Sequence, residues 1–417
     1  MAADSEKPSS LSPPQSSTPA QDDTFDGGRQ AWATVIGGFL IVATTFGYAN
    51  SFGVYQDFYT QSHTASSSAI SWIGSTQLFF LQAMALPAGK LLDMGYFRAT
   101  TLVGSLIYVF SLFMVSISHP DKYYQLYLSQ GLGMGIGAGL LYVPSVAVQA
   151  HHWRARRALA MGSSIGGIIF PIMLNQLFKS RVGFHWGVRA SAFIVLGMLI
   201  VANLLMSAKS SRAGPRVNPD IKGIITDVPY LLAILGVFIC FWGVFFPYFY
   251  LQLFAMIKGV NTQVAFYTLA ILNAAALPGR VLPNMLADRF GPFNVAIPLV
   301  ALCGIMIFAL FGVKTVASTV IFSVIYGFAS GAFLSLCAPA IAVLARDPSE
   351  VGIRFGIAFF FSSFGVLMGN PVIGALLGNT FHWNRAIVWS GVSIMAGTAF
   401  LLLTRAILVR RRGSQLI

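Results

Sequence analysis

The feature that most restricts the fold of this chain is a series of long apolar runs separated by short polar segments. About 20 apolar residues in a helix cross the ~30 Å hydrocarbon layer of a membrane. With 56% hydrophobic and 9% charged residues, the chain lacks the polar surface that a soluble protein of 417 residues needs. The sequence therefore predicts an all-α membrane protein with twelve transmembrane helices, at 32–55, 69–91, 100–118, 123–149, 158–178, 190–206, 230–256, 264–286, 295–313, 318–345, 355–377 and 386–408.

The distribution of basic residues predicts the orientation of the chain. Most of the 26 Lys and Arg residues fall in segments on the side that holds both termini, and cytoplasmic segments carry the excess of these residues. Both termini are therefore expected in the cytoplasm. The expected organisation is a disordered cytoplasmic tail at 1–28, a six-helix bundle at 29–206, a cytoplasmic linker at 207–227, a second six-helix bundle at 228–410 and a cytoplasmic tail at 411–417.

The two parts of the chain repeat each other at a nearly constant offset. Asp93 and Asp288 lie 195 residues apart, and the tripeptide Phe184–Trp186 recurs 197 residues later as Phe381–Trp383. Matches in the same order at corresponding spans indicate a duplicated unit. The sequence therefore predicts two pseudo-symmetric bundles with a substrate site between them, near the middle of the membrane.

One apolar run, Val264–Leu286, contains Arg280, which precedes the charged Asp288 by eight residues and is therefore expected about 12 Å inside the span, close to the membrane midplane. A charge at this depth costs about 3 to 10 kcal/mol, and ionisable residues inside a membrane usually mark the path of a substrate or an ion. Within the boundaries given above, the other runs contain no Lys, Arg, Asp or Glu at a comparable depth. We expect Arg280 to bind an anionic group, with a structural role in helix packing as the alternative.

Polar residues in other spans are candidates for the same cavity. The substrate-binding residues that we expect beside Arg280 are Asn50, Tyr48, Asn273, Tyr142 and Tyr326. Each of them has a second interpretation, because single polar side chains in membrane helices often form hydrogen bonds between helices.

Two loop segments carry a motif that resembles that of a known family. GKLLDMGYFR at Gly89–Arg98 follows the second span, and NMLADRFGPFN at Asn284–Asn294 follows the eighth. Both are similar to the loop motif GxLaDrxGxr of the major facilitator superfamily, although an asparagine stands where the second copy should have its first glycine. The expected gating or structural residues of these loops are Asp93, Arg98, Asp288 and Arg289.

Two further segments resemble the monocarboxylate transporter-like family, particularly its fungal members. They are DGGRQAW, which begins at Asp26, and HHWRARRALAMGSSIGGIIFP at His151–Pro171. The resemblance implies alternating access, in which an anion and a proton cross the membrane together. It adds Asp26, Arg154, Arg156 and Arg157 to the expected gating or structural residues.

The resemblance also implies charged site residues, which this chain retains only in part. Studied members use a lysine in the first span, and an aspartate and an arginine one helical turn apart in the eighth. Arg280 matches that arginine, whereas Asn50 and Ala276 stand at the lysine and aspartate positions. An aspartate-based proton step is therefore not transferable, and proton coupling is left open.

The sequence thus predicts a secondary transporter that moves a small organic anion, foremost a monocarboxylate, by alternating access in a lipid bilayer. A larger fungal secondary metabolite or a vitamin is the alternative substrate, and a non-transporting receptor on the same fold is a second alternative. Catalytic triads, metal-spaced His or Cys clusters and phosphate loops are not visible, so neither an enzyme nor a cofactor is expected. The dispersed basic residues argue against nucleic acid as a partner. The expected location is the plasma membrane, with the vacuolar or another organelle membrane as the alternative.

Overall fold

The computed structural model describes residues 29–149, 166–206, 221–346, 350–378 and 380–416. These ranges consist of helices and connecting loops and contain no β-strand. Within them, eleven helical segments are long and apolar enough to cross a membrane, and Ile168–Lys179 is a shorter apolar helix. The predicted all-helical membrane fold is therefore confirmed, whereas the fifth expected span, 158–178, is described only from Gly166 onwards.

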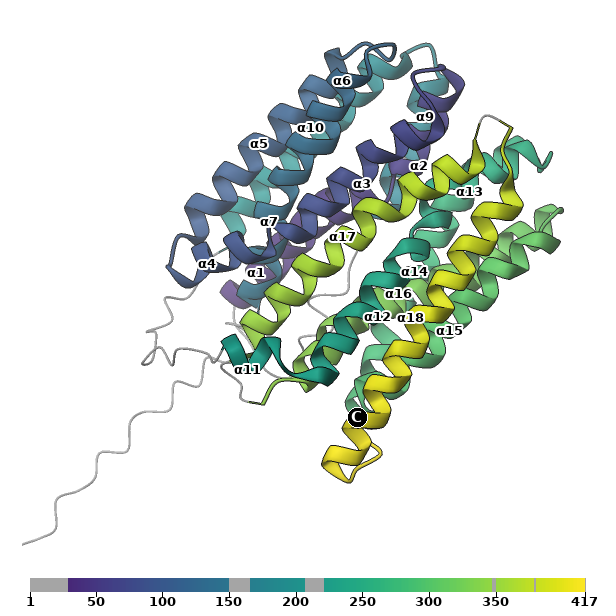
Figure 1. The fold of residues 1–417 in the computed structure, drawn as a ribbon. Helices are drawn as coiled ribbons and strands as arrows, with labels where there is room; N and C mark the ends of the chain where they lie inside the picture. Colours follow the sequence, from purple (N-terminus) through teal and green to yellow (C-terminus); the bar gives the residue numbers. More distant parts are fainter. Residues whose placement is uncertain (1–28, 150–165, 207–220, 347–349, 379, 417) are drawn as a thin grey trace, which may run out of the picture.

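The helices of the first half form one bundle, drawn in purple to blue in Figure 1. Three of its spans are built from more than one helical segment, and two of these include a π-helical segment. In chain order the segments are α1 (Arg29–Val42), η1 (Ala43–Gly47), α2 (Phe52–Gln61), α3 (Ser67–Ala83), α4 (Ala85–Asp93), α5 (Phe97–Ile117), α6 (Tyr123–Leu126), η2 (Tyr127–Gly133), α7 (Met134–Gln149), α9 (Gly166–Lys179) and α10 (Gly183–Leu205).

The helices of the second half form a second bundle beside the first, drawn in teal to yellow in Figure 1. The short helix α11 lies within the expected linker 207–227, and the last long helix extends into the expected tail, as far as Arg412. The segments are α11 (Ile221–Ile225), α12 (Val228–Val244), α13 (Phe246–Ile257), α14 (Thr262–Phe290), α15 (Pro292–Ala309), η3 (Leu310–Gly312), α16 (Val316–Val343), α17 (Val351–Leu377) and α18 (Trp383–Arg412).

Several spans are longer than the sequence predicted, among them the first and the sixth. The first continues to Gln61 and does not end at Tyr55, because the polar segment after the apolar run remains helical. The sixth begins at Gly183 and not at Ala190. The longer first span contains Asp57, a carboxylate that lies outside the predicted boundary of that span.

Glycine allows two helices of the second half to pack very closely. A Cβ atom at Gly279 of α14 would collide with the carbonyl oxygen of Phe328 in α16, and a Cβ atom at Gly327 would collide with the carbonyl oxygen of Leu272. Small residues let membrane helices approach to backbone contact. The tight pair of α14 and α16 therefore fixes the backbone position of Arg280.

The two ends of the bundles differ in charge. We call the end at which α4, α7 and α14 end the basic end, and the other the opposite end; the basic end lies at the bottom of Figure 1. Exposed arginines gather at the basic end, at Arg346, Arg410, Arg411 and Arg412.

The halves meet mainly along four helix pairs, which are α3 with α17, α4 with α17, α2 with α13 and α9 with α14. Near the opposite end, the contact includes hydrogen bonds, such as the one from Ser68 Oγ to the carbonyl oxygen of Pro371 at 2.8 Å. Toward the basic end, the contact between α3 and α17 is made by apolar groups. There the rings of Phe79 and Phe364 meet edge to face, with centroids 5.0 Å apart.

Candidate substrate site between the two halves

The first span of each half is interrupted near its middle. In the first half, the helix gives way to a turn at Asn50 and Ser51, after the π-helical segment η1. In the second half, Phe245 separates α12 from α13. Asn50 and Phe245 lie 195 residues apart, which is the offset of the sequence repeat. Matching interruptions in two repeats are typical of carrier substrate sites, because irregular backbone inside a membrane lies within protein or beside a cavity.

Arg280 lies against the interrupted span of the other half. Its guanidinium carbon is 4.8 Å from the centre of the Phe46 ring in η1, a position in which a cation is attracted to the ring face. Tyr142 of α7 stacks on the same ring, with centroids 5.9 Å apart. Tyr142 and Tyr248 both interact electrostatically with Arg280. The cation is 8% exposed and is surrounded by aromatic side chains from both halves.

Two buried amides lie on the same helix faces as this cluster. Asn50 follows Phe46 by one helical turn, and its N–H donates to the Phe46 carbonyl oxygen at 3.0 Å. Asn273 precedes Arg280 by two turns on α14, and its Nδ2 donates to the carbonyl oxygen of Leu269 at 2.9 Å. Within the described part of the chain, neither amide atom of the Asn50 side chain nor Oδ1 of Asn273 has a hydrogen-bond partner. Buried polar atoms normally have one, so these atoms are suited to contact a bound molecule.

Two of the expected substrate-binding residues bond within their own halves. The Tyr48 hydroxyl lies 2.5 Å from the Tyr55 hydroxyl and 3.0 Å from Ser191 Oγ. The Tyr326 hydroxyl donates to the carbonyl oxygen of Val244 at 2.7 Å. Both tyrosines thus connect helices of a single half, which is the structural alternative that the sequence left open for them.

The position at which the family resemblance places an aspartate lies in a tight helix contact. Ala276 of α14 is buried and faces α16, where a Cβ atom at Gly331 would lie 2.8 Å from the Ala276 Cβ. A carboxylate at this position would enter the close contact between α14 and α16. Alanine fits that packing, so this position supplies no titratable group.

The loop motifs lie at the basic end. Arg98, Asp288 and Arg289 are exposed, and the guanidinium carbon of Arg289 is 5.6 Å from the centre of the Phe290 ring. Asp93 is the last residue of α4. The gating role of these loop residues stays a prediction. The other expected gating residues, Asp26, Arg154, Arg156 and Arg157, lie outside the described residues.

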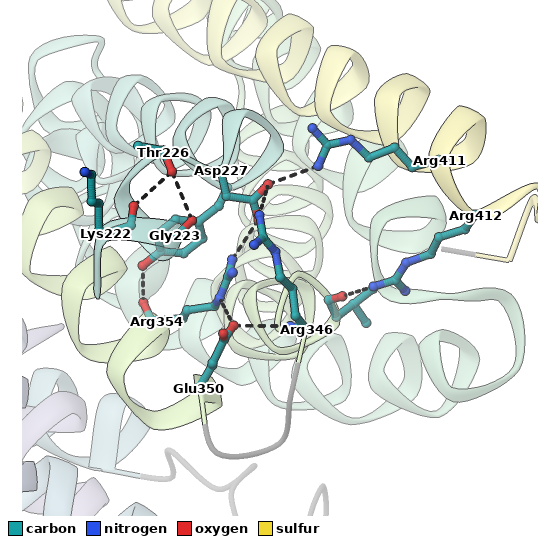
Figure 2. A network of polar contacts seen from close by, with 11 residues as sticks. Lys222, Gly223, Thr226, Asp227, Arg346, Glu350, Arg354, Arg411 and Arg412 are labelled. Atoms are coloured by element: carbon teal, nitrogen blue, oxygen red, sulfur yellow. Dashed lines mark hydrogen bonds and ion pairs between the residues drawn. The ribbon is translucent and has the colours of Figure 1, made fainter. Parts of the chain in front are cut away.

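A buried ion network at the basic end, centred on Arg354, is absent from the sequence predictions (Figure 2). The side chain of Arg354 is fully buried; its Nη1 lies 3.0 Å from Asp227 Oδ2 and its Nε lies 2.9 Å from Glu350 Oε2. The guanidinium carbon is 4.9 Å from the centre of the Tyr230 ring, and the Tyr230 hydroxyl donates to the Arg354 carbonyl oxygen at 2.5 Å. The arginine is thus held by two carboxylates and one aromatic ring.

Asp227, which lies between α11 and α12, extends this network to two more arginines. Its Oδ1 is 3.0 Å from Nη1 of Arg411 in α18 and 3.7 Å from Nη2 of Arg346. All of these residues belong to the second half, as Figure 2 shows. In the sequence, Asp227 is visible as an acid at the end of the polar linker and Arg354 as an arginine at the start of the eleventh span. They are 127 residues apart, so the sequence does not reveal their contact.

A second carboxylate absent from the sequence predictions lies between the halves near the opposite end. Asp57 of α2 is 4% exposed. It accepts hydrogen bonds from Gln252 Nε2 of α13 at 3.0 Å and from Gln61 Nε2 at 2.8 Å. In the sequence, Asp57 is visible only as an acidic residue after the first apolar run. Because its neighbours are polar, the sequence does not indicate that the helix continues through it.

Residues 37–338 match the family model described as the Major Facilitator Superfamily. The chain belongs to this superfamily. Its helical architecture and the central position of Arg280 between two halves are consistent with that membership, and it is a membrane transporter of the major facilitator type.

Curated relatives of this major facilitator are fungal transporters of similar length. It is 38% identical over 385 residues to "MFS-type transporter dbaD" of Emericella nidulans, which covers 90% of this chain and 85% of the relative. It is 36% identical over 387 residues to "Aspyridones efflux protein apdF" of the same fungus, with 91% and 78% covered. It is 34% identical over 409 residues to "Agnestins efflux protein AgnL12" of Paecilomyces divaricatus, with 94% and 93% covered. None of these three names refers to a monocarboxylate, so they do not support the narrower resemblance.

Solved structures of other transporters share the fold. The D-xylose–proton symporter aligns with a TM-score of 0.68 over 89% of this chain and 96% of its own, at 14% identity. The nucleoside transporter NupG aligns with a TM-score of 0.67 over 90% of this chain and 99% of its own, at 13% identity. At such low identity, this likeness concerns the fold alone.

Proposed function

We propose that this major facilitator exports a fungal secondary metabolite, and that Arg280 binds an anionic or carbonyl oxygen of that molecule. The observation that carries the proposal is the aromatic enclosure of Arg280 between the two halves. The names of two relatives, efflux proteins for aspyridones and agnestins, support export of such compounds. The proposal therefore replaces the monocarboxylate with the larger substrate that the sequence left as its alternative.

The side chains around Arg280 suit a molecule with a flat apolar body and a polar oxygen. Phe46, Tyr142 and Tyr248 offer aromatic surface, against which a ring system packs. The guanidinium pairs with an oxygen through two parallel hydrogen bonds in surroundings of low dielectric. A short monocarboxylate would pair with the cation but would leave the aromatic surface without contact.

Alternating access between the two halves would carry the substrate across the membrane, and the substrate gradient would set the direction. The substrate contacts Arg280 of the second half and Phe46 and Tyr142 of the first, so a rotation of one half against the other changes the end from which the molecule can leave. The basic end corresponds to the predicted cytoplasmic side, and a metabolite made in the cytoplasm enters there.

Counterflow of labelled compounds in proteoliposomes tests this function. The panel contains acidic aromatic fungal metabolites together with lactate and pyruvate as the monocarboxylate arm. We expect exchange of aromatic compounds and little exchange of lactate or pyruvate. Exchange of the monocarboxylates alone would refute the proposed substrate class, and saturable binding without any exchange would support the receptor alternative.

Substitutions of Arg280 test the site itself. Arg280→Ala should lower the exchange rate at least about tenfold, which corresponds to about 1.4 kcal/mol. Arg280→Lys should give an intermediate rate, because lysine keeps the charge and loses the paired hydrogen bonds. Arg410→Ala, which removes an exposed arginine of α18 for which no gating or binding role is expected, is the control and should exchange like the wild type. An exchange rate of Arg280→Ala equal to that of the wild type would refute the binding role of Arg280.

A further inference from the structure

Asp57 and Gln252 occupy equivalent positions in the two halves and touch each other. They are 195 residues apart, the offset of the repeat, and Gln252 Nε2 donates to Asp57 Oδ2 at 3.0 Å. Nearby, the rings of Phe52 and Phe249 also meet, with centroids 4.9 Å apart. Equivalent residues contact each other only beside a two-fold axis. The helices α2 and α13 therefore line the pseudo-two-fold axis near the opposite end.

The hydrogen bonds around Gln252 have a fixed direction. Asn175 Nδ2 of α9 donates to the carbonyl oxygen of Phe266 at 3.1 Å, and a carbonyl oxygen can only accept. The Oδ1 of Asn175 therefore faces Gln252 and accepts from its Nε2 at 3.1 Å, while Nδ2 also donates to Gln252 Oε1 at 3.3 Å. Gln252 is thereby held with its NH₂ group toward Asp57, so Asp57 Oδ2 has to act as an acceptor.

The other carboxyl oxygen of Asp57 can hold a proton without breaking this contact. Oδ1 faces Gln61, whose Nε2 donates to it at 2.8 Å. Gln61 is exposed at the end of α2, and its amide can turn so that its oxygen accepts a hydrogen bond from a protonated Oδ1. The protonated and the ionised forms of Asp57 are therefore both compatible with the bond to Gln252.

The two forms differ in the cost of burial. Asp57 is 4% exposed, and the ion pairs of the described residues do not include it. Lys179 of α9 is the charged side chain that interacts with it electrostatically, and the Lys179 ammonium lies 3.0 Å from the centre of the Phe266 ring. A buried carboxylate without an ion pair is more costly than the neutral acid. Separation of α2 from α13 would admit water to Asp57, and the ionised carboxylate would then no longer be more costly than the neutral acid.

We propose that Asp57 is a proton-binding site, which takes up a proton from water as the opposite end closes and returns it to water as that end opens. The proton is bound at Oδ1, and no other reactant takes part. Because a bound proton favours one of two conformations, acid shifts their populations toward closure of the opposite end. A role in coupling metabolite export to a proton gradient rests on the proposed function, whereas the proton-linked closure does not.

The test measures the distance between the ends of α2 and α13. Ser62→Cys and Lys258→Cys place spin labels at two exposed positions there, and the native Cys240, Cys303 and Cys337 are buried. In lipid nanodiscs without substrate, we expect mildly acidic buffer to shift the distance distribution toward shorter values than neutral buffer does.

Two variants and one control decide the assignment. Asp57→Asn imitates the neutral acid, because its oxygen accepts from Gln252 and its NH₂ donates to Gln61, so it should give the short distance in both buffers. Gln252→Glu adds a second carboxyl group on the axis, so it should open the end in neutral buffer and enlarge the shift on acidification. Asp121→Asn, in an exposed loop at the same end, should keep the wild-type shift.

Each outcome supports or overturns the proposal. A wild-type pH shift in Asp57→Asn overturns it, and so does a wild-type distance that is the same in both buffers. Should Asp57→Asn not fold, an unaltered pH shift in Gln252→Glu overturns it instead. Failure of every metabolite in counterflow, with the pH shift retained, would refute the proposed export function and leave the proton-binding site standing.

Discussion

The two ends of the molecule hold their helices together in different ways. At the opposite end, polar contacts join the halves, as between Asp57 and Gln252. At the basic end, the buried ion network around Arg354 joins α12, α17 and α18, which all belong to the second half. Where α4 and α17 of the two halves meet at that end, Leu86 packs beside Gly356.

From this difference we expect the contacts between the halves to break during a transport cycle and the contacts within one half to persist. A hydrogen bond contributes about 0.5 to 1.5 kcal/mol, or up to about 3 kcal/mol when one partner is charged. Removal of one partner from a buried ion pair costs about 3 to 5 kcal/mol. A contact that breaks in each cycle should be a hydrogen bond, which is cheap to lose. A network that stays within one half can include buried ion pairs. The comparison predicts that substitutions at the basic end change stability, whereas substitutions at the opposite end change conformation.

The largest expected effect is that of Arg354→Ala at the basic end. It leaves Asp227 and Glu350, whose side chains are 5% and 13% exposed, without their buried cation, so we expect a loss of about 3 to 5 kcal/mol in the free energy of unfolding. Thermal unfolding of the purified protein in detergent measures it. A melting temperature equal to that of the wild type would contradict the structural role of the network.

A smaller effect of a different kind is expected for Gln252→Leu at the opposite end. Removal of the donor to Asp57 Oδ2 weakens the contact between α2 and α13 by about 1 to 3 kcal/mol and should shift the label distance between positions 62 and 258 toward longer values. The melting temperature should change less than it does for Arg354→Ala. If the label distance stays short while the protein loses stability, the contact is a permanent one and the comparison of the two ends fails.

The smallest effect is expected for Arg346→Ala. This arginine also contacts Asp227, at 3.7 Å, but its side chain is 58% exposed, and exposed ion pairs contribute about 0 to 1 kcal/mol. Thermal unfolding should therefore give a value within that range of the wild type. A loss as large as that of Arg354→Ala would show that burial of the arginine is not what makes the network strong.

The sequence predicted those features that follow from the residue composition of a single continuous segment. Apolar runs of membrane length predicted the helical membrane fold, because the hydrocarbon layer imposes the same requirement on every span. Arg280 was found for the same reason, as a charge within such a run. The offset of 195 residues also separates the two helix interruptions at Asn50 and Phe245, although the interruptions themselves were not predicted.

The parts that the sequence did not predict depend on contacts between distant segments. In the sequence, Arg354 and Asp227 each look like an ordinary charged loop residue, and only the packing of α17 against α12 shows that they form an ion pair. Asp57 lies after the apolar run, and only the continuation of α2 to Gln61 brings it between the halves. The bond from the Tyr326 hydroxyl to the Val244 carbonyl oxygen is likewise a contact that the sequence does not reveal. In each case the partner, and not the residue type, decides the role.

The backbone contact between α14 and α16 has a consequence for the way in which Arg280 works. Because a Cβ atom at Gly279 or Gly327 would strike the main chain of the neighbouring helix, neither helix has room to twist or slide past the other. Under the proposed function, we therefore expect the guanidinium to change compartments through rotation of its whole half as a rigid body. A glycine contact between two helices, and not the flexibility of a single residue, would then decide from which side of the membrane a bound molecule is accessible.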